Sequence, residues 1–191
     1  MMLSAVVQLI DGFNGAPALG CHPAFLLDGK RYWPHAKTDG FYAFSELDQG
    51  RHRLTAMALA FFTQEVELTV PLSLPLASAI VPCVLAPSPL YPFPPGTTLI
   101  RGQVRDAATQ RPLAEVDVEL RYATQRSGAR SGTTQTSGHG QYNGRYALAP
   151  RGKLAAHTEA TLIFSKTGYA TAQTQLTLEP ATTQFVDIEM R

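Results

Sequence analysis

A chain of 191 residues can form one large domain or two domains of about 95 residues each. Hydrophobic residues make up 45% of the chain and charged residues 16%, so the chain has enough apolar surface to build a core. The formal net charge is +1, which excludes the strongly basic surface of a dedicated nucleic-acid-binding protein. We therefore expect a folded protein with no nucleic-acid partner.

The sequence predicts neither a secretory leader nor membrane insertion. The N-terminal segment MMLSAVVQLIDG lacks a basic region and reaches an acidic residue at Asp11. The apolar run from Val66 to Leu90 contains Glu67 and five prolines, which would break a membrane helix. A cytoplasmic location and a place in an exported assembly both fit this pattern.

Strand signals dominate the first half of the chain. Short β-branched or aromatic runs alternate with polar residues at a period of two, and Gly, Pro, Asn and Asp separate them. This pattern is typical of a sandwich of two packed sheets. Seven strands are predicted here, at residues 5–10, 22–27, 31–35, 40–45, 51–60, 63–70 and 78–85.

A proline-rich segment follows, with five prolines among residues 86–96. Proline fixes φ and favours an extended predecessor, so a stiff polyproline-like spacer is expected here. We therefore predict a first domain at 1–86, a linker at 87–96 and a second domain at 97–191.

The second half repeats the strand signals of the first. Seven strands are again predicted, at residues 98–104, 114–122, 132–136, 144–149, 160–166, 170–178 and 184–190. Its longest polar stretch, Ala123 to Gly144, contains Arg126 and Arg130. Inserted loops on β scaffolds often carry acquired function, and a disordered hairpin tip is the alternative.

Two sequence patterns occur once in each half. The stretch GFYAFS from Gly40 matches GRYALA from Gly144 at a shift of 104 residues, which implies an insertion of about nine residues within the polar stretch. An earlier pattern recurs at a shift of 95 residues and consists of Gln8, Asp11 and Pro17, matched by Gln103, Asp106 and Pro112. One small β fold used twice explains both matches.

The second half has the pattern GxVxDxxTxxPLxxVxV from Gly102 to Val118, followed by Gly144, Tyr146 and the Thr167-Gly168-Tyr169 segment. In this it resembles the carboxypeptidase regulatory-like family, whose members are seven-stranded, transthyretin-like β-sandwiches. The resemblance covers residues 97–191, and residues 3–87 resemble a divergent copy with Asp11 and Pro17 retained. It implies an all-β chain of two tandem seven-stranded transthyretin-like β-sandwiches, with a role in folding support, recognition or attachment rather than catalysis.

No catalytic or metal-binding motif is evident in the sequence. The five histidines show none of the spacings that place two metal ligands on one face, although His22 and His35 could meet if the intervening hairpin turns at Asp28-Gly29. Neither a GxSxG elbow nor a P-loop is present. We expect no catalytic residue, metal or cofactor. Cys21 and Cys83 are expected either as two buried thiols or as a bridge within the first domain.

Surface recognition remains as the expected activity. Aromatic and arginine side chains on a surface favour binding, and the candidates are Tyr32, Trp33, Arg51, Arg53, Arg126 and Arg130. Core packing is the alternative for Trp33, and solvated strand ends are the alternative for Arg51 and Arg53. We expect a non-catalytic structural or protein-binding module of a larger bacterial assembly, at a cell surface or in a phage-tail-like particle. The alternative is a carbohydrate-binding module that uses Trp33 and nearby aromatics. Exposed edge strands also allow a homodimer.

Overall fold

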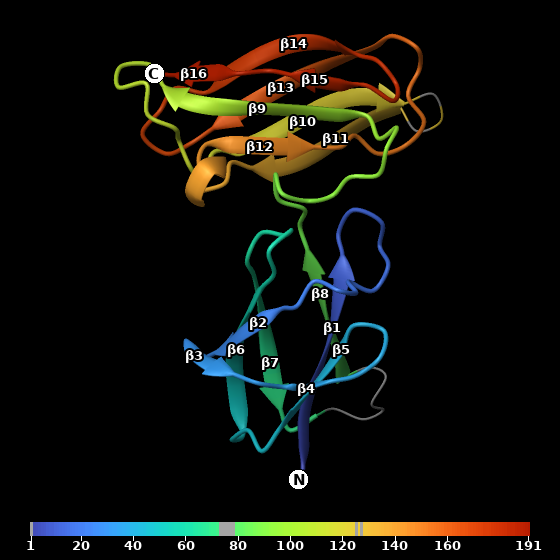
Figure 1. The fold of residues 1–191 in the computed structure, drawn as a ribbon, viewed down its shortest axis with the longest axis vertical. Coiled ribbons are helices and arrows are strands. Elements are labelled where there is room, and N and C mark those ends of the chain that lie inside the picture. Colours follow the sequence, from blue (N-terminus) through green and yellow to red (C-terminus); the bar gives the residue numbers. More distant parts are fainter. Residues whose placement is uncertain (1, 73–78, 125, 127) are drawn as a thin grey trace. The chain divides into compact units, whose positions relative to one another are not determined.

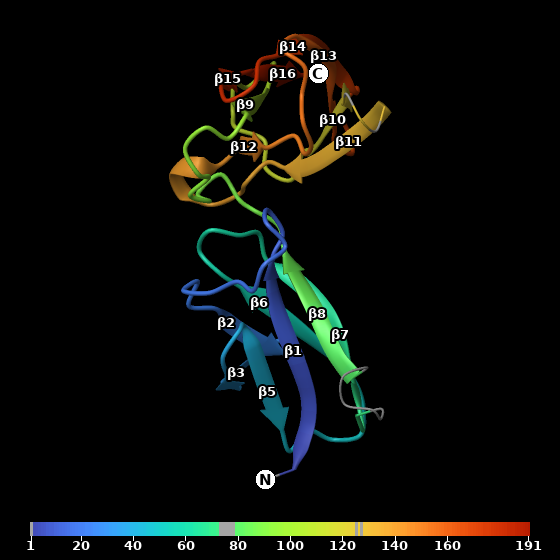
Figure 2. The same ribbon diagram turned by 90° about the vertical axis from the view of Figure 1, so that its right-hand side faces the viewer.

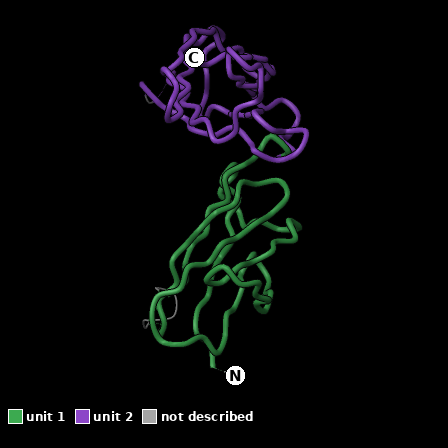
Figure 3. Tube along the Cα trace, turned by 90° about the vertical axis from the view of Figure 1, so that its left-hand side faces the viewer, with its two compact units in different colours: residues 1–90 green, residues 91–191 purple. Residues whose placement is uncertain are grey.

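The computed structural model describes residues 2–72, 79–124, 126 and 128–191. The chain divides into two compact units, Met1–Leu90 and Tyr91–Arg191, and the division falls within residues 87–96 (Figure 3). Each unit is built from two four-stranded sheets, and a short 3-10 turn lies at Gly140–Tyr142 (Figure 1). The predicted all-β architecture of two tandem β-sandwiches is therefore confirmed.

The first unit packs the sheet β4-β5-β1-β8 against the sheet β3-β2-β6-β7 (Figure 2). Strands β1 and β8 are parallel, and the other neighbours within both sheets are antiparallel. The strands are β1 (Leu3–Asp11), β2 (Ala24–Leu27), β3 (Lys30–Tyr32), β4 (His35–Ala36), β5 (Phe41–Ser45), β6 (Gly50–Met57), β7 (Gln64–Val70) and β8 (Ile80–Leu85). Ser78, where the last of these strands was predicted to begin, lies outside the described residues.

The second unit repeats this topology, except that β4 has no counterpart and the last strand is divided into β15 and β16. The sheet β11-β10-β13-β14 faces the sheet β12-β9-β15, in which β16 also pairs with β9. The strands are β9 (Leu99–Asp106), β10 (Asp117–Thr124), β11 (Gly128–Gln135), β12 (Arg145–Leu148), β13 (Thr158–Ser165), β14 (Ala172–Leu178), β15 (Thr183–Phe185) and β16 (Ile188–Met190).

In each unit the structure divides one predicted strand into two. The run predicted at residues 31–35 becomes β3 and β4, which pair with different sheets on either side of Trp33 and Pro34. Proline cannot donate to a strand ladder, so the chain leaves one sheet there and joins the other. The C-terminal strand is interrupted at Val186 and Asp187, between β15 and β16.

In the polar stretch from Ala123 to Gly144, β11 covers Gly128–Gln135 and so begins earlier than the strand predicted at 132–136, while residues 136–144 form a loop with the 3-10 turn. Strands β10 and β11 pair over eight residues on each side, whereas the corresponding β2 and β3 pair over three. Gln125 and Ser127, at the hairpin tip, lie outside the described residues. The additional residues of the second unit therefore extend an edge hairpin.

Each unit has its own hydrophobic core between its sheets. Alternate residues of the strands point inward, as the burial of Val7 and Leu9 on β1 and of Val118 and Leu120 on β10 shows. In the second core, Tyr146 is 1% exposed, its ring is 5.6 Å from that of Phe164, and its hydroxyl donates a hydrogen bond to the Val186 carbonyl at 2.8 Å. The remaining buried residues include Phe25, Phe44, Leu54, Leu68, Leu85, Ile100, Val104, Leu162, Leu178 and Met190.

Both cysteines have free thiols, so the bridge considered from the sequence is not formed. Cys83 lies on the inward side of β8 and is fully buried. Cys21 lies in the loop before β2, where its thiol is 3.5 Å from the Ala18 carbonyl. Burial raises the pKa of Cys83 to about 11 and also raises the pKa of Cys21.

The repeated sequence pattern builds the same turn in both units. Asp11 accepts a hydrogen bond from the Phe13 N–H at 2.7 Å, and Asp106 accepts one from the Ala108 N–H at 2.9 Å. The residue after each aspartate donates its N–H to the last strand of its unit, Gly12 to Leu85 and Ala107 to Met190. Each aspartate therefore fixes the end of the first strand against the end of the last.

A glycine completes this turn. Gly40 precedes β5 with φ +72°, and a Cβ there would lie 2.8 Å from the Leu9 carbonyl oxygen. Gly144 precedes β12 with the same φ, and its Cβ would lie 2.8 Å from the Val104 carbonyl oxygen. Both positions need glycine for its backbone freedom and for the close approach.

We expect Gly40→Ala to lower the free energy of unfolding of the first unit by about 2 to 4 kcal/mol, because the new methyl group adds a backbone clash to left-handed strain. Gly15→Ala is the matched control, since Gly15 has φ +76° and no atom within 4 Å of its Cβ position. The control should cost about 1 to 2 kcal/mol from strain alone. Denaturant unfolding measures both, and equal losses would show that the Leu9 contact is unimportant.

Candidate functional site

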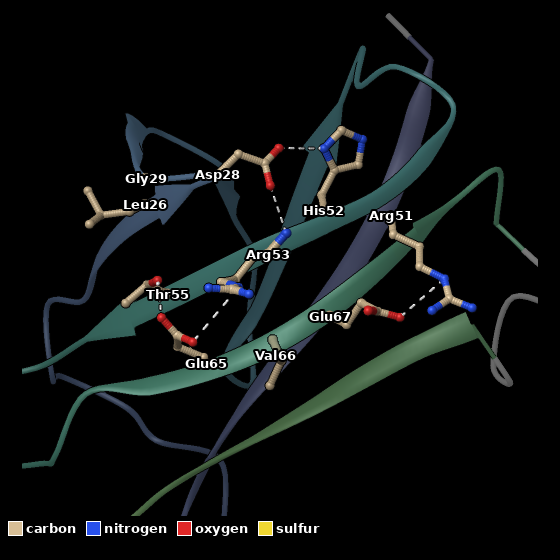
Figure 4. Close-up of a pocket in the computed structure, with 10 residues that line it drawn as sticks. All are labelled: Leu26, Asp28, Gly29, Arg51, His52, Arg53, Thr55, Glu65, Val66 and Glu67. Carbon is tan, nitrogen blue, oxygen red and sulfur yellow. Dashed lines mark hydrogen bonds and ion pairs between the residues drawn. The ribbon is translucent and has the colours of Figure 1, made fainter.

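The outer face of the sheet β3-β2-β6-β7 carries an ordered set of charged side chains (Figure 4). In the register of β6 and β7, Arg53 is opposite Glu67 and Thr55 is opposite Glu65, while the inward neighbours Leu54 and Leu68 are fully buried. A shallow depression crosses this face. We call its outward side chains the charged face, which consists of Leu26, Arg51, Arg53, Thr55, Glu65 and Glu67.

Diagonal ion pairs link the two strands of the charged face. Arg51 Nε is 3.7 Å from Glu67 Oε1, and Arg53 Nε is 4.0 Å from Glu65 Oε2. All four side chains are more than half exposed. Exposed pairs of this kind contribute little to stability. Their effect is to hold positive and negative groups in a fixed alternating order.

A histidine fixes the hairpin at the end of this face. His52 Nδ1 lies 2.7 Å from Asp28 Oδ2, and its Nε2 lies 2.9 Å from the Asp48 carbonyl oxygen. The other Asp28 oxygen accepts the Arg53 N–H at 2.8 Å. Asp28 and Gly29 both have positive φ, as a type I′ hairpin turn requires. The turn predicted at Asp28-Gly29 is thus present and is tied to β6.

The hydrogen bonds of His52 favour its protonated form. The Asp48 carbonyl and the Asp28 carboxylate both raise the pKa of His52 above its usual 6.5, because each accepts a ring N–H. The bond from His52 and the Arg53 N–H lower the pKa of Asp28. Each group of the pair therefore favours the charged form of the other.

We expect the first unit to be more stable at about pH 6 than at about pH 8. The pKa of His52 is higher in the folded chain than in the unfolded chain. Protonation of His52 therefore stabilises the fold fully below the unfolded pKa, and this contribution is lost as pH rises through the folded pKa. Asp28→Asn keeps a residue that tolerates positive φ and should bring the His52 pKa back toward 6.5. NMR titration of the His52 ring and unfolding at both pH values measure these effects. An unchanged His52 pKa in Asp28→Asn would contradict the assignment.

Trp33 stands at the edge of the same sheet, just after β3. Its side chain is 74% exposed, and the Arg31 guanidinium lies 5.4 Å from the ring centroid. Arg31 is paired in register with Leu26 of the charged face. The charged face and Trp33 therefore form one continuous surface of the first unit.

A second shallow hollow lies beside Trp33. Its floor is aromatic, with the Phe25 and Tyr42 rings 4.9 Å apart, and His22 and Pro34 contribute to its walls. Phe25 is buried, so the floor is part of the core. The hollow thus combines a rigid base with one exposed indole.

The structure groups some of the predicted binding residues and separates others. Trp33, Arg51 and Arg53 all lie on the surface just described. Tyr32 instead points inward, where its ring stacks on Phe44 at 5.3 Å and its hydroxyl donates to the Ser45 carbonyl at 2.9 Å. Tyr32 therefore lines the hollow from within and supports the fold.

The other two predicted residues belong to the second unit. Arg126 is exposed in the turn between β10 and β11, and Arg130 is exposed on β11 opposite Tyr122. Their place on an ordered edge hairpin differs from the predicted long loop.

The sequence interpretation missed the acidic half of the charged face. Glu65 and Glu67 alternate at the period of a strand, as Arg51 and Arg53 do. Only the register of β6 against β7 shows that the two pairs meet. The pairing of Asp28 with His52, 24 residues apart, has no local sequence signal either.

The described residues provide neither a metal site nor a membrane-spanning helix. In the part of the chain that is described, no three His, Cys, Asp or Glu side chains come together as a group that could hold a metal ion. No helix among residues 2–72, 79–124, 126 and 128–191 is long and apolar enough to cross a bilayer.

Comparisons with known proteins give only distant likenesses. No protein-family model and no curated protein sequence matches the chain. Among solved structures, the TIE protein of Bacillus anthracis aligns with 98% of this chain and 34% of its own length, so this chain spans about a third of it, at 8% identity and a TM-score of 0.35.

Two pilins are also similar. A shaft pilin of Lactobacillus rhamnosus GG has 12% identity, a TM-score of 0.33, and coverage of 98% of this chain and 97% of its own. A minor pilin of Streptococcus agalactiae has 17% identity, a TM-score of 0.33, and coverage of 98% and 95%. The fold assignment itself rests on the strand pairing of the two units.

Proposed function

We propose that this chain is a non-catalytic structural or protein-binding module, an accessory component of a larger bacterial assembly at a cell surface or in a phage-tail-like particle. The observation that supports this function best is the continuous surface formed by Trp33, Arg31 and the charged face. The place in a bacterial assembly extends the same proposal by analogy of fold.

The charged face has the properties of a protein-recognition surface. Its side chains stand on a sheet whose backbone is fixed by the β6–β7 ladder, so binding would order few additional groups. Alternating charges in a fixed order select a partner with the complementary order and reject others. The face is therefore suited to specificity.

Trp33 and Arg31 supply the anchor that such a surface needs. Tryptophan and arginine are enriched among the residues that dominate binding energy. The indole is 74% exposed. In the described part of the first unit, the Arg31 guanidinium is the one cation that lies against its ring. A partner that covers this ring would bury a large apolar area.

We also infer that both units are carboxypeptidase regulatory-like domains. The residues that carry this resemblance form the turn common to the two units, in which Asp106 and Asp11 hold the end of the first strand. In the second unit, Tyr169 of the motif donates its hydroxyl to Asp106 Oδ2 at 2.8 Å. A structural role for the motif agrees with a module that is not itself the catalyst.

We expect Trp33→Ala to weaken binding of the natural protein partner by about 10- to 30-fold, as loss of a central tryptophan anchor does. Its stability should change by less than about 0.5 kcal/mol, because the side chain is mostly exposed. Affinity capture of the tagged chain from its own cells, followed by titration of the recovered partner, measures the loss.

Charge reversal tests the charged face in the same experiment. Arg51→Glu with Arg53→Glu places four acidic groups side by side and should release the partner. Arg121→Glu is the control, because Arg121 forms an exposed ion pair with Glu119 at 2.9 Å on the second unit. Partner recovery that is equal for the wild type and both first-unit variants would reject this face as the binding surface.

Carbohydrate binding is the second candidate, and the hollow beside Trp33 favours it. An exposed indole beside a polar histidine and an aromatic floor can stack on a sugar ring while edge groups meet its hydroxyls.

Trp33 is the sole tryptophan of the chain, so its fluorescence reports directly on this hollow. If the hollow binds a sugar, glycans selected on an array should change the emission with dissociation constants of about 1 mM or below, typical of a weak shallow site. If glycans bind to the chain on the array but do not change the Trp33 emission, they bind elsewhere on the chain.

A further inference from the structure

The second unit carries an arginine strip that has no counterpart among the described residues of the first. Strand β9 turns Arg101, Gln103 and Arg105 to the outer face of its sheet, since the alternate residues Ile100 and Val104 are fully buried. Arg145 of β12 is paired in register with Gln103 and so points outward beside it. The three guanidinium groups thus share one face of the β12–β9 pair.

These arginines are held by neutral groups. The Arg101 guanidinium lies 5.7 Å from the Phe93 ring centroid, and that of Arg145 lies 6.0 Å from the Tyr142 ring centroid. Arg105 donates two hydrogen bonds to Gln103 Oε1, at 3.2 and 2.8 Å. Within the described part of the chain, none of the three has a carboxylate within ion-pair distance.

This differs from the charged face of the first unit, where each of Arg51 and Arg53 is paired with a glutamate. Stacking and amide contacts orient the arginines of the second unit and leave their charge uncompensated. The unit as a whole is also basic, with eleven Lys and Arg against eight Asp and Glu in residues 91–191. The ligand of this face should therefore be an anion.

The spacing of the strip indicates what kind of anion fits. Residues two apart on a strand are about 7 Å apart, so Arg101, Arg145 and Arg105 occupy three successive steps of that length along the strand direction. Alternate side chains of an extended peptide repeat at the same distance. Phe185, 77% exposed and paired in register with Arg101, offers an apolar contact at one end.

Two carboxylates beside the arginine strip disfavour a ligand that carries a negative charge on every residue. Asp187 accepts the Gln103 N–H at 2.8 Å, and Glu189, paired in register with Arg105, accepts the Gln110 amide at 3.1 Å. A nucleic-acid backbone, with a charge on every residue, would approach these groups. A peptide can place carboxylates on the arginine side and neutral side chains on the other.

We propose that the outer face of β9 and β12 binds an extended acidic segment of a partner protein, in which Asp or Glu at alternate positions meets Arg101, Arg145 and Arg105. This rests on the proposed protein-binding function and gives the chemistry of one partner. The carboxylates would form charge-assisted hydrogen bonds with guanidinium groups that are already oriented.

The test uses the full chain and a labelled peptide of four Glu-Thr repeats, with binding followed by fluorescence anisotropy. We expect saturable binding that weakens steeply between about 0.05 and about 0.5 M salt, because exposed charges are screened. Each single Arg→Gln change at the three positions should weaken binding about two- to fivefold, and the triple change about tenfold or more.

Matched controls separate the strip from general charge. Arg121→Gln, on the other sheet of the same unit, should bind as the wild type does. A Gln-Thr peptide should not bind, and a peptide with four consecutive Glu before four Thr should bind more weakly than the alternating one. Circular dichroism confirms that the triple variant is folded, and a triple Arg→Lys variant should keep part of the binding at low salt.

The proposal fails if the triple Arg→Gln variant binds as well as the wild type, or if the alternating and consecutive peptides bind equally. If the chain binds heparin or single-stranded DNA but does not bind the peptide, the proposal is also overturned and the strip is assigned to another polyanion. The peptide experiment tests only the arginine strip. If it fails, the result of partner capture with the Trp33 and charged-face variants is unaffected.

Discussion

The turn that joins the first strand of each unit to its neighbours is the constraint on which the rest of the structure depends. An aspartate at the end of the strand binds backbone N–H groups of the turn, and a glycine with φ +72° lets the neighbouring strand, β5 or β12, approach within contact of the first strand's carbonyl. The last strand is tied to the next residue by a backbone hydrogen bond. Three strands of one sheet are thereby fixed at a single point, so the recurring aspartate and glycine have the same structural role in both units.

The opposite sheet differs more between the two units, although in the second unit Tyr169, between β13 and β14, donates its hydroxyl to Asp106 of this turn. Its edge hairpin is short in the first unit, where β2 and β3 pair over three residues, and long in the second, where β10 and β11 pair over eight. Two consequences follow for the surface. The short hairpin ends at Trp33 and exposes the indole at the sheet edge, while the long hairpin continues the sheet and adds Arg130 to an ordered strand. One topology thus presents two different edges.

Much of the fold could be predicted from sequence because its signals are local. The alternation in β1 and β9, the Asp-Pro turns and the glycines before β5 and β12 all lie within a few residues of the structure they specify. The inward turn of Tyr32 was not predictable, since it depends on Phe44 and on the Ser45 carbonyl across the sandwich. The ion pairs of Arg51 and Arg53 depend on the register of two strands, and the polar composition of residues 123–144 concealed the first part of β11, residues 128–131, which pairs with β10.

The two arginine-bearing faces show how register determines the use of one residue type. On the first unit, Glu65 and Glu67 enter the ladder one diagonal step from Arg53 and Arg51, so the face is locally neutral and recognises by pattern. On the second unit, the positions beside Arg101 and Arg145 are occupied by Phe93 and Tyr142, which hold a guanidinium without neutralising it. Salt weakens recognition mainly where a face carries uncompensated charge, because that charge is what the ions screen. The strip of the second unit should therefore set the salt dependence of partner binding, and the charged face with Trp33 should set its selectivity.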